Sequence, residues 1–591
     1  MDTERKEVET IETAPPASMR WRLAFVLLLA MPALRALPTL LDSSSFPLMI
    51  VSFMGPAVIG LLLVLWWCFA SRVSGKEKIM GLLGLAAVLI VGLPLTHRTL
   101  QGMPMLLSIV PTAIAAFTFG LVLFTKLPRW RVPIAVASAA MGVGYWDALQ
   151  SEGVTGRFEM QLLWRWQPTA EESYLQELRD RDPSKNTNQY ATTETTLQTS
   201  PWPSFRGDRR DGVLAGVTLV DDWNTSPPEE MWRRRIGPGW SSFSAANDRL
   251  YTQEQRGESE SVVCLSAETG ETLWDVVYPS RFWEPIAGAG PRATPTLSNE
   301  GLFALGGNGM LLCVNPLTGN VRWKRDLKED AERAPPTWGF SASPLVAEGM
   351  VIVHAGGDGD KGLFAYRTSN GEIAWSTSSG DHSYSSAQIA TFDGRLGALM
   401  MTNDGLQFID LANGQPIWKY DWKVQNYRAL QPLVLGSTVF VASSLGEGTR
   451  RIDVARSEDG AWEIQEAWTT RDMKSEFNDF VHYEGAIYGF DGSIFASIDA
   501  DSGKRNWKRG RYGNGQVLLL ADSGQLLITS EKGKVILVQA SAEKLDERSS
   551  FQAISGKTWN HSVLVNDRLY VRNAQEAACY RMPIQNAGDD E

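Results

Sequence analysis

Residues 267–274 read AETGETLW, which is a strand end, a tight turn at Gly270 and a second strand closed by Trp274. Related copies, PLTGNVRW, TSNGEIAW, LANGQPIW and ADSGKRNW, end at Trp323, Trp375, Trp418 and Trp507. A looser copy ends at Trp468, a degenerate one at Phe551, and an isolated tryptophan strand contains Trp232. These aromatics lie 39 to 52 residues apart. A repeat of this length, with one glycine turn and one tryptophan per unit, is typical of a β-propeller blade.

Each repeat contains four short β-rich runs separated by Gly, Asn and Asp turns of the hairpin type. Seven units end at Trp274 through Phe551, and an eighth begins at Lys557 but stops one strand short. We expect the strand around Trp232 to supply the missing strand, because closing the ring removes an open sheet edge. The sequence therefore predicts an all-β, eight-bladed propeller over residues 201–583, followed by a disordered tail over 584–591.

Composition narrows the possible partners. The chain has 591 residues and a formal net charge of -11, which argues against binding of nucleic acid through a basic surface.

The four cysteines are too few and too scattered for a disulfide framework. Cys264 and Cys313 each precede a repeat tryptophan by ten residues, and we expect both to be buried at one equivalent strand position.

Five apolar stretches precede the repeats, at about 21–41, 46–70, 79–95, 103–124 and 131–146. They predict an α-helical transmembrane region of about five helices over residues 20–146, after a disordered cytoplasmic N-terminus over 1–19. The first stretch contains Arg35 and two prolines, and the fifth has only about 16 residues. Residues 147–200 are expected to be a connector that contains one short amphipathic helix and a flexible linker.

Loop charges predict the orientation of these helices. The second loop carries Arg72, Lys76 and Lys78, and the fourth carries Lys126, Arg129 and Arg131. The first loop has no basic residue, and the third has only Arg98. By the positive-inside rule, loops two and four face the cytoplasm, and the propeller lies outside it. The sequence thus predicts a multi-pass protein of the inner membrane, in contact with the lipid bilayer, with a periplasmic domain.

The repeat resembles the PQQ-binding-like propeller family, whose blades carry a consensus similar to A-x-D-x-x-T-G-x-x-x-W. DADSGKRNW (499–507) and AETGETLW match it most closely, and segments such as WPSFRG (202–207) resemble uncharacterised membrane-anchored bacterial members. The family includes quinoprotein alcohol dehydrogenases and the non-enzymatic BamB-type lipoprotein of outer-membrane assembly. The resemblance implies the fold, and it leaves the function to be argued from the site.

The blade entries and second hairpin turns are expected at one mouth of the propeller, where convergent polar and aromatic groups could bind a cofactor or a partner. Turn-forming Asn, Asp and Gly residues need no functional explanation. The remaining candidates are Gln253, Glu254, Gln255, Arg256, Arg281, Trp283, Glu284, Arg292, Trp338, Asn478, Asp479, Asp491, Arg511, Trp559, Asn560 and His561.

Two functions fit these residues. The first is a binding or scaffolding module with a protein partner at one face. The alternative is a PQQ- and Ca²⁺-dependent alcohol or sugar dehydrogenase, with Asp479 as the base and Glu284 and Asn478 as Ca²⁺ ligands. The adjacent Cys-Cys pair that the family's alcohol dehydrogenases share is absent, and no histidines lie at metal-ligand spacing. The sequence therefore favours the binding module.

Overall fold

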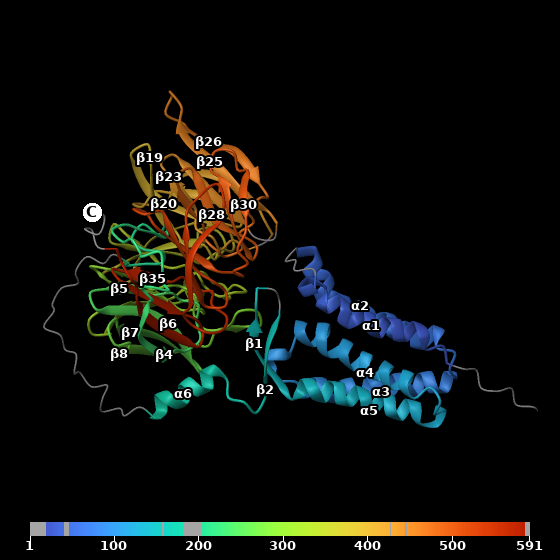
Figure 1. The fold of residues 1–591 in the computed structure, drawn as a ribbon. Helices are drawn as coiled ribbons and strands as arrows, with labels where there is room; N and C mark the ends of the chain where they lie inside the picture. The colour runs from blue at the N-terminus through green and yellow to red at the C-terminus, as the bar shows by residue number, and fades with distance from the viewer. Residues whose placement is uncertain are drawn as a thin grey trace, which may run out of the picture. The chain divides into compact units, whose positions relative to one another are not determined.

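The computed structural model describes residues 19–40, 46–156, 159–180, 202–425, 427–443 and 446–585. The chain forms two compact units, Met1–Gln167 and Pro168–Glu591, and each is described by itself (Figure 1). The disorder expected for the N-terminus up to residue 18, the linker over 182–200 and the tail beyond residue 585 lie outside the described residues.

The first unit has long helices at the positions of all five apolar stretches. They are α1 (Arg22–Leu40), α2 (Phe46–Leu65) continued by η1 (Trp66–Ala70), α3 (Gly75–Gly92) continued by η2 (Leu93–Leu95), η4 (Met105–Ile109) leading into α4 (Val110–Leu123), and α5 (Pro128–Asp147). The short helix η3 (Arg98–Leu100) and the antiparallel hairpin of β1 (Leu149–Val154) and β2 (Met160–Trp164) complete the unit.

The predicted number of membrane spans was wrong. Within the described residues, three helices are long and apolar enough to cross a membrane: Ile50–Ala70, Gly75–Leu95 and Met105–Leu123. Helix α1 contains Arg35 and two internal prolines. Helix α5 begins with Arg129 and Arg131 and ends at Asp147. Both helices are less apolar on average than the three that qualify.

Helices α3 and α5 lie side by side and run in the same direction. At their N-terminal ends, Arg131 Nη2 contacts Glu77 Oε2 at 2.5 Å in an ion pair whose arginine is buried. At their C-terminal ends, the Thr96 hydroxyl donates a hydrogen bond to Asp147 Oδ1 at 3.0 Å. The two helices are therefore joined by polar contacts at both ends, with apolar residues packed between them.

The second unit contains α6 (Ala170–Asp180) and eight blades of four antiparallel strands each, one of which is extended by a fifth, parallel strand, and this confirms the eight-bladed propeller. Blades 1 to 4 are β5 (Ser244–Ala246), β6 (Arg249–Arg256), β7 (Ser259–Ser266) and β8 (Thr272–Pro279); β11 (Thr296–Ser298), β12 (Gly301–Leu305), β13 (Met310–Val314) and β14 (Val321–Asp326); β15 (Leu345–Ala347), β16 (Met350–His354), β17 (Leu363–Arg367) and β18 (Ile373–Thr377); and β19 (Gln388–Phe392), β20 (Arg395–Thr402), β21 (Gly405–Ile409) and β22 (Pro416–Asp421).

Blades 5 to 8 follow the same order. They are β23 (Leu433–Leu435), β24 (Thr438–Ser443), β25 (Gly448–Arg456) and β26 (Trp462–Thr470); β27 (Val481–Tyr483), β28 (Ala486–Asp491), β29 (Ile494–Asp499) and β30 (Arg505–Lys508); β31 (Gln516–Leu520), β32 (Gln525–Thr529), β33 (Lys534–Gln539) and β34 (Asp546–Gln552); and β35 (Val563–Val565), β36 (Arg568–Arg572), β37 (Glu576–Arg581) and β4 (Glu229–Arg235). Between blades lie α7 (Leu327–Asp330) and the hairpin of β9 (Trp283–Glu284) and β10 (Gly288–Ala289).

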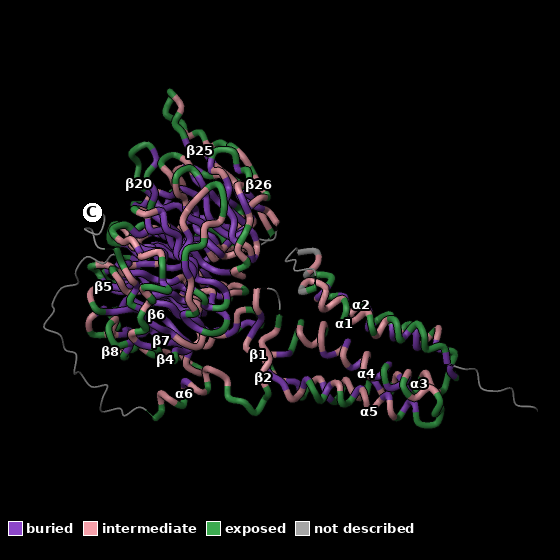
Figure 2. Tube along the Cα trace, in the orientation of Figure 1, coloured by how far each residue is buried: buried purple, intermediate pink, exposed green. Residues whose placement is uncertain are grey.

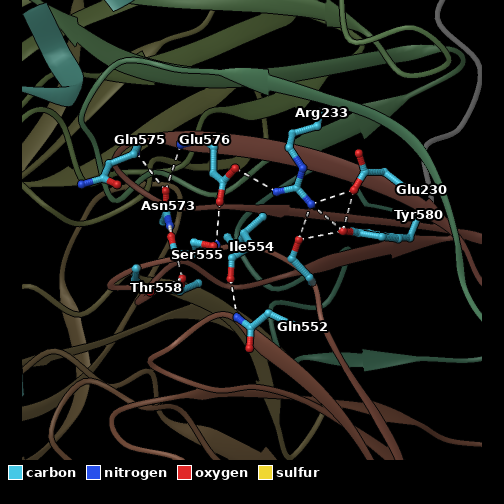
Figure 3. Close-up of polar contacts among 12 residues, drawn as sticks. Glu230, Arg233, Gln552, Ile554, Ser555, Thr558, Asn573, Gln575, Glu576 and Tyr580 are labelled. Atoms are coloured by element: carbon cyan, nitrogen blue, oxygen red, sulfur yellow. Dashed lines mark hydrogen bonds and ion pairs between the residues drawn. The ribbon is translucent and has the colours of Figure 1, made fainter. Parts of the chain in front are cut away.

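The ring closes as the sequence predicts, because β4 pairs antiparallel with β37 and places Trp232 opposite Cys579. Figure 3 shows the side-chain contacts that join β4 to its neighbours in the last blade. The Arg233 guanidinium bonds to Glu576 at 2.8 Å, and to Glu230 and the Tyr580 hydroxyl at 2.7 Å each. The N-terminal end of the propeller thus supplies the outer strand of the last blade, and no open edge remains at this position.

The repeat tryptophans wedge each blade against the next. Trp323 Nε1 donates to the Thr368 carbonyl at 2.7 Å, and its ring packs on the turn at Gly371. Gly371 has a φ of +74°, and a Cβ there would lie 2.8 Å from the Trp323 ring, so the turn requires glycine. The same pair of contacts joins Trp232 to the turn at Gly270, Trp274 to Gly319, Trp375 to Gly414 and Trp468 to Gly503.

The cores lie between neighbouring blades, where buried residues follow the strands (Figure 2). Cys264, Cys313 and Cys579 are fully buried free thiols, and their cross-strand partners are the repeat tryptophans Trp274, Trp323 and Trp232. The expectation of one equivalent, buried cysteine position is confirmed.

Candidate functional site

The blade entries meet around the propeller axis in a closed circle of hydrogen bonds, called here the entry ring. The entries of blades 1 to 4 use hydroxyl acceptors of the next blade. The backbone N–H groups of Ser242, Thr294 and Ser343 donate to Thr294, Ser343 and Ser386 at 2.9, 2.9 and 2.8 Å. Short side chains at the start of the inner strands therefore bind each blade to its neighbour.

Blades 4 to 8 continue the entry ring with amides and one carboxylate. The contacts are Gln431 Nε2 to the Ser386 carbonyl (3.3 Å), Gln431 N–H to Asp479 Oδ1 (2.8 Å), Asn478 Nδ2 to the Gly515 carbonyl (2.5 Å), Gln516 Nε2 to the Trp559 carbonyl (2.9 Å) and Asn560 Nδ2 to the Ser241 carbonyl (2.8 Å). Asn478, Asp479 and Asn560, three of the predicted site residues, are thus structural members of this ring.

The axis inside the entry ring is filled by the chain itself, in a stretch called here the axial segment, Trp202–Leu214. Its start pairs with blade 1, where Trp202 forms a β-bridge with Ala245. Its end pairs with blade 7, where β3 (Val213–Leu214) lies parallel to β31. Between these points the segment also contacts blades 2, 3, 4, 6 and 8 through Arg206, Arg210, Pro203 and Phe205. It therefore touches seven of the eight blades.

Arg210 is the centre of this packing. Its guanidinium donates to the Ala387 carbonyl at 2.7 Å, the Ser343 carbonyl at 3.2 Å and the Thr296 hydroxyl at 2.9 Å, and it also contacts the Pro344 carbonyl. Burial lowers the pKa of Arg210 to about 9. Its φ of 59° is a left-handed conformation that costs a non-glycine residue about 1 kcal/mol or more. The buried hydrogen bonds outweigh this strain and hold blades 2, 3 and 4 together.

Arg206 occupies the other side of the axis, beside Asp479. Its Nη1 lies 3.6 Å from Asp479 Oδ1, and both side chains are almost completely buried. Arg206 Nη2 also donates to the Phe480 and Asp211 carbonyls at 3.0 and 2.8 Å. Gly212, with a φ of +72°, leaves room for the guanidinium, since a Cβ there would lie 2.7 Å from Arg206 Nη2.

His561 completes this cluster. Its Nε2 lies 3.3 Å from Asp479 Oδ2, although the alignment is not that of a hydrogen bond, and Phe205 meets its ring edge-on at 4.8 Å. Burial lowers the pKa of His561 and outweighs the opposite effect of Asp479. Burial alone would raise the pKa of Asp479, but Arg206 and His561 lower it. The cluster is therefore a carboxylate compensated by Arg206, next to a neutral imidazole.

The predicted candidates on β6 of blade 1 have structural partners. Gln253 donates to the Ala293 and Leu305 carbonyls at 2.7 and 3.2 Å, and Gln255 donates to three carbonyls of its own hairpin and the following loop. Glu254 is fully buried and accepts hydrogen bonds from Arg256 at 2.6 Å and the Tyr174 hydroxyl at 2.8 Å.

Tyr174 belongs to α6, so this helix is docked on blade 1. A second contact comes from Glu171, whose carboxylate accepts hydrogen bonds from Nη1 and Nη2 of Arg281 at 2.9 and 3.0 Å. Burial alone would raise the pKa of Glu254, but Arg256 and Arg234 lower it, so the carboxylate stays ionised. Glu254, Arg256 and Arg281 thus fix the end of the connector to the propeller.

The remaining candidates are spread over several entries. Glu284 and Arg292 form a buried ion pair at 2.8 Å, and Glu284 also accepts the Ile286 and Ala287 N–H groups. Asp491 is enclosed by three cations, Lys474 at 2.6 Å, Lys508 at 2.8 Å and Arg505 at 3.0 Å. Trp283 is exposed on β9, and Arg511 is exposed between β30 and β31. These residues do not converge on one site.

Two aromatic groups, called here the rim aromatics, lie half-buried at the blade entries. In the first, Trp559 contacts Trp240 and Phe477 with ring centroids 5.0 Å apart in each case, and Lys557 Nζ lies 4.6 Å from the Trp559 centroid. In the second, Trp338 meets Tyr384 at 5.3 Å and Tyr427 at 4.7 Å. Trp338 and Trp559 were predicted as site residues, whereas Tyr427 and Phe477 were missed because single aromatics in irregular loops give no periodic signal.

A cavity of about 530 Å³, called here the rim groove, lies next to the second group. It is formed by the entries to blades 3 and 4 and the second hairpin of blade 3. Its lining residues are Ala331, Glu332, Arg333, Ala334, Pro335, Pro336, Thr337, Gly356, Gly357, Asp358, Lys361, Asp381, His382 and Tyr384. Both signs of charge and three apolar rings (Pro335, Pro336 and Tyr384) therefore face the same hollow.

Comparison with known proteins identifies the repeat. Residues 258–509 match the family described as outer membrane protein assembly factor BamB. The matched residues run from the second half of blade 1 to the end of blade 6. The comparison with curated proteins returned no match.

Several solved structures resemble this chain at low identity. BamB from Moraxella catarrhalis is 15% identical over 60% of this chain and 100% of its own, with a TM-score of 0.44. Quinohemoprotein alcohol dehydrogenase from Comamonas testosteroni is 11% identical over 71% of this chain and 86% of its own, also with a TM-score of 0.44. Quinohemoprotein alcohol dehydrogenase ADHIIG from Pseudomonas putida is 12% identical over 66% of this chain and 81% of its own, with a TM-score of 0.44. These values do not distinguish a dehydrogenase from a binding protein.

The residues proposed for PQQ and Ca²⁺ do not fit these groups. Asp479 is 2% exposed, and the Arg206 guanidinium occupies the place beside it where a cation would bind. Glu284 is committed to Arg292 and belongs to a different blade entry. Among the described residues, no three His, Cys, Asp or Glu side chains are grouped so that they could hold a metal ion. Asp479 therefore cannot act as a base toward a bound substrate while the axial segment is in place.

Proposed function

We propose that this protein is a membrane-anchored binding module whose propeller holds a protein partner at the rim. The observation that carries the proposal is the axial segment, which fills the axis where an enclosed ligand would bind. The open features are then the rim groove and the rim aromatics. Half-buried Trp and Tyr side chains next to groups of both charges are the composition of a protein–protein interface rather than of a catalytic pocket.

The membrane anchor rests on the three apolar helices. Helix α5 runs parallel to α3 and is joined to it at both ends, through Glu77–Arg131 and Thr96–Asp147, so the C-terminal end of α5 lies on the same side as that of α3. The basic residues Lys76, Lys78 and Arg129 then lie at the cytoplasmic ends. The chain after Asp147 emerges on the opposite side, and we propose that the propeller lies outside the cytoplasm, attached to the inner membrane.

A photoreactive amino acid tests the rim as the binding surface. Placed at Thr337, an exposed residue of the rim groove, it is expected to crosslink the full-length protein to one defined partner in native membranes. The matched control is Thr318, an exposed residue in the turn between β13 and β14, on the opposite face of the ring. Crosslinking of the same partner from both positions, or from Thr318 alone, would refute the assignment of the rim.

A second function, the quinoprotein dehydrogenase, is supported by the repeat family, which also contains such enzymes. It would require the axial segment to leave the axis. The buried contacts of Arg206 and Arg210 oppose this movement, so the binding module is the better-supported proposal.

A further inference from the structure

The first unit contains a polar cavity at the shared C-terminal ends of α3 and α5. Its volume is about 570 Å³, and its lining residues are Pro94, Leu95, Thr96, His97, Arg98, Asp147 and Arg165. Two guanidinium groups and one carboxylate thus surround a hollow that lies directly beyond the last turn of an apolar helix. From this arrangement we propose that the cavity binds the phosphate headgroup of a bilayer phospholipid, an inference that rests on the membrane anchoring proposed above.

The cations of the cavity are available for an anion. The Arg98 side chain is exposed and has no hydrogen bond or ion pair within the described part of the chain. Arg165 Nη1 donates to the Leu95 carbonyl at 3.1 Å and lies 3.5 Å from the Asp147 carbonyl, which fixes the guanidinium at the edge of the cavity. Planar guanidinium groups bind phosphate oxygens through paired N–H donors, so two of them in one hollow favour a phosphate.

The level of the cavity matches that of lipid headgroups. Immediately before it, α3 and η2 expose Ile90, Val91 and Leu95, which are 73%, 66% and 58% accessible and would face acyl chains. Exposed aromatic side chains lie beside Asp147 and Arg165 in the sequence. Trp164 stacks on Trp166 with centroids 5.0 Å apart, and Tyr145 meets Trp164 edge-on at 6.1 Å.

Tryptophan and tyrosine gather where the hydrocarbon core meets the headgroups. The cavity therefore opens at the interface and not in free solution, which favours a lipid phosphate over inorganic phosphate. The Asp147 carboxylate also gives the cavity an acceptor for a headgroup ammonium or hydroxyl group.

The test uses the full chain, purified in detergent, stripped of lipid and then supplied with phosphatidylethanolamine or phosphatidylglycerol. Native mass spectrometry should show one retained phospholipid per chain. Arg98→Gln and Arg165→Gln should each reduce this occupancy about fivefold, since one basic residue near a membrane surface contributes about this factor. Arg98→Lys should restore most of the loss caused by Arg98→Gln, because it keeps the charge. Arg129→Gln, an exposed arginine at the opposite end of α5, is the matched control and should leave lipid retention unchanged.

Three results separate the possibilities. Equal lipid retention by Arg98→Gln, Arg165→Gln and the native protein would overturn the proposed site. Displacement of the lipid by millimolar inorganic phosphate would show a site for free anions and would also overturn it. Recovery of the chain outside the membrane fraction would instead refute the anchoring, and this is scored before any lipid is added.

Discussion

Arg206→Gln is expected to destabilise the propeller by about 3–5 kcal/mol, the usual cost of removing one partner of a buried ion pair. The substitution leaves the Asp479 carboxylate, which is 2% exposed, without its guanidinium. It also removes the donors that bind the Phe480 and Asp211 carbonyls. The free energy of unfolding of the full-length protein, measured in urea by tryptophan fluorescence, reports this loss.

Two further variants show that the buried charge is the cause. Arg209→Gln removes a neighbouring arginine whose side chain is 72% exposed, and it should change stability by less than about 1 kcal/mol. The double variant Arg206→Gln/Asp479→Asn should recover part of the loss, because no uncompensated charge remains in the interior. An Arg206→Gln protein as stable as Arg209→Gln would contradict the placement of Arg206 on the axis.

Trp323→Ala is expected to cost about 3–5 kcal/mol, the range for deletion of a large buried aromatic side chain. Trp323 is 9% exposed and bridges two blades, through its hydrogen bond to the Thr368 carbonyl and its packing on Gly371. Trp323→Phe keeps a ring in this position but leaves the Thr368 carbonyl without its donor, and it should cost about 1–3 kcal/mol.

The control for this position is Trp283→Ala, which removes a tryptophan that is 37% exposed at a blade entry. It should have a much smaller effect on the urea midpoint than Trp323→Ala. If the two alanine variants lose the same stability, the repeat tryptophans are not the wedges between blades.

The repeat made the propeller predictable because its signals are local. A glycine turn such as that at Gly371 and a closing tryptophan such as Trp323 lie within a few residues of each other, and each blade repeats them. The missing outer strand followed from counting strands, and β4 confirms it. The spans were harder to predict, since α1 and α5 form long helices although they contain prolines and charged residues and are less apolar than the three candidate spans.

The site was only partly predictable. Spacing correctly placed Asn478, Asp479 and Asn560 at blade entries, but it could not show that their polar groups bind the neighbouring blades. The axial segment begins with WPSFRG (202–207), and no pattern in it predicts that it fills the axis. Arg206 reaches Phe480 and Arg210 reaches Ala387 across 274 and 177 residues of sequence, and no local pattern encodes such contacts.

The filled axis is the central claim, and PQQ binding tests it most directly. The purified full-length protein, incubated with PQQ and Ca²⁺ and passed through gel filtration, is expected to retain no quinone absorbance, because Arg206 and Phe205 cover Asp479 and His561. Retention of one quinone per chain, lost in Asp479→Ala, would contradict the account and establish the dehydrogenase instead.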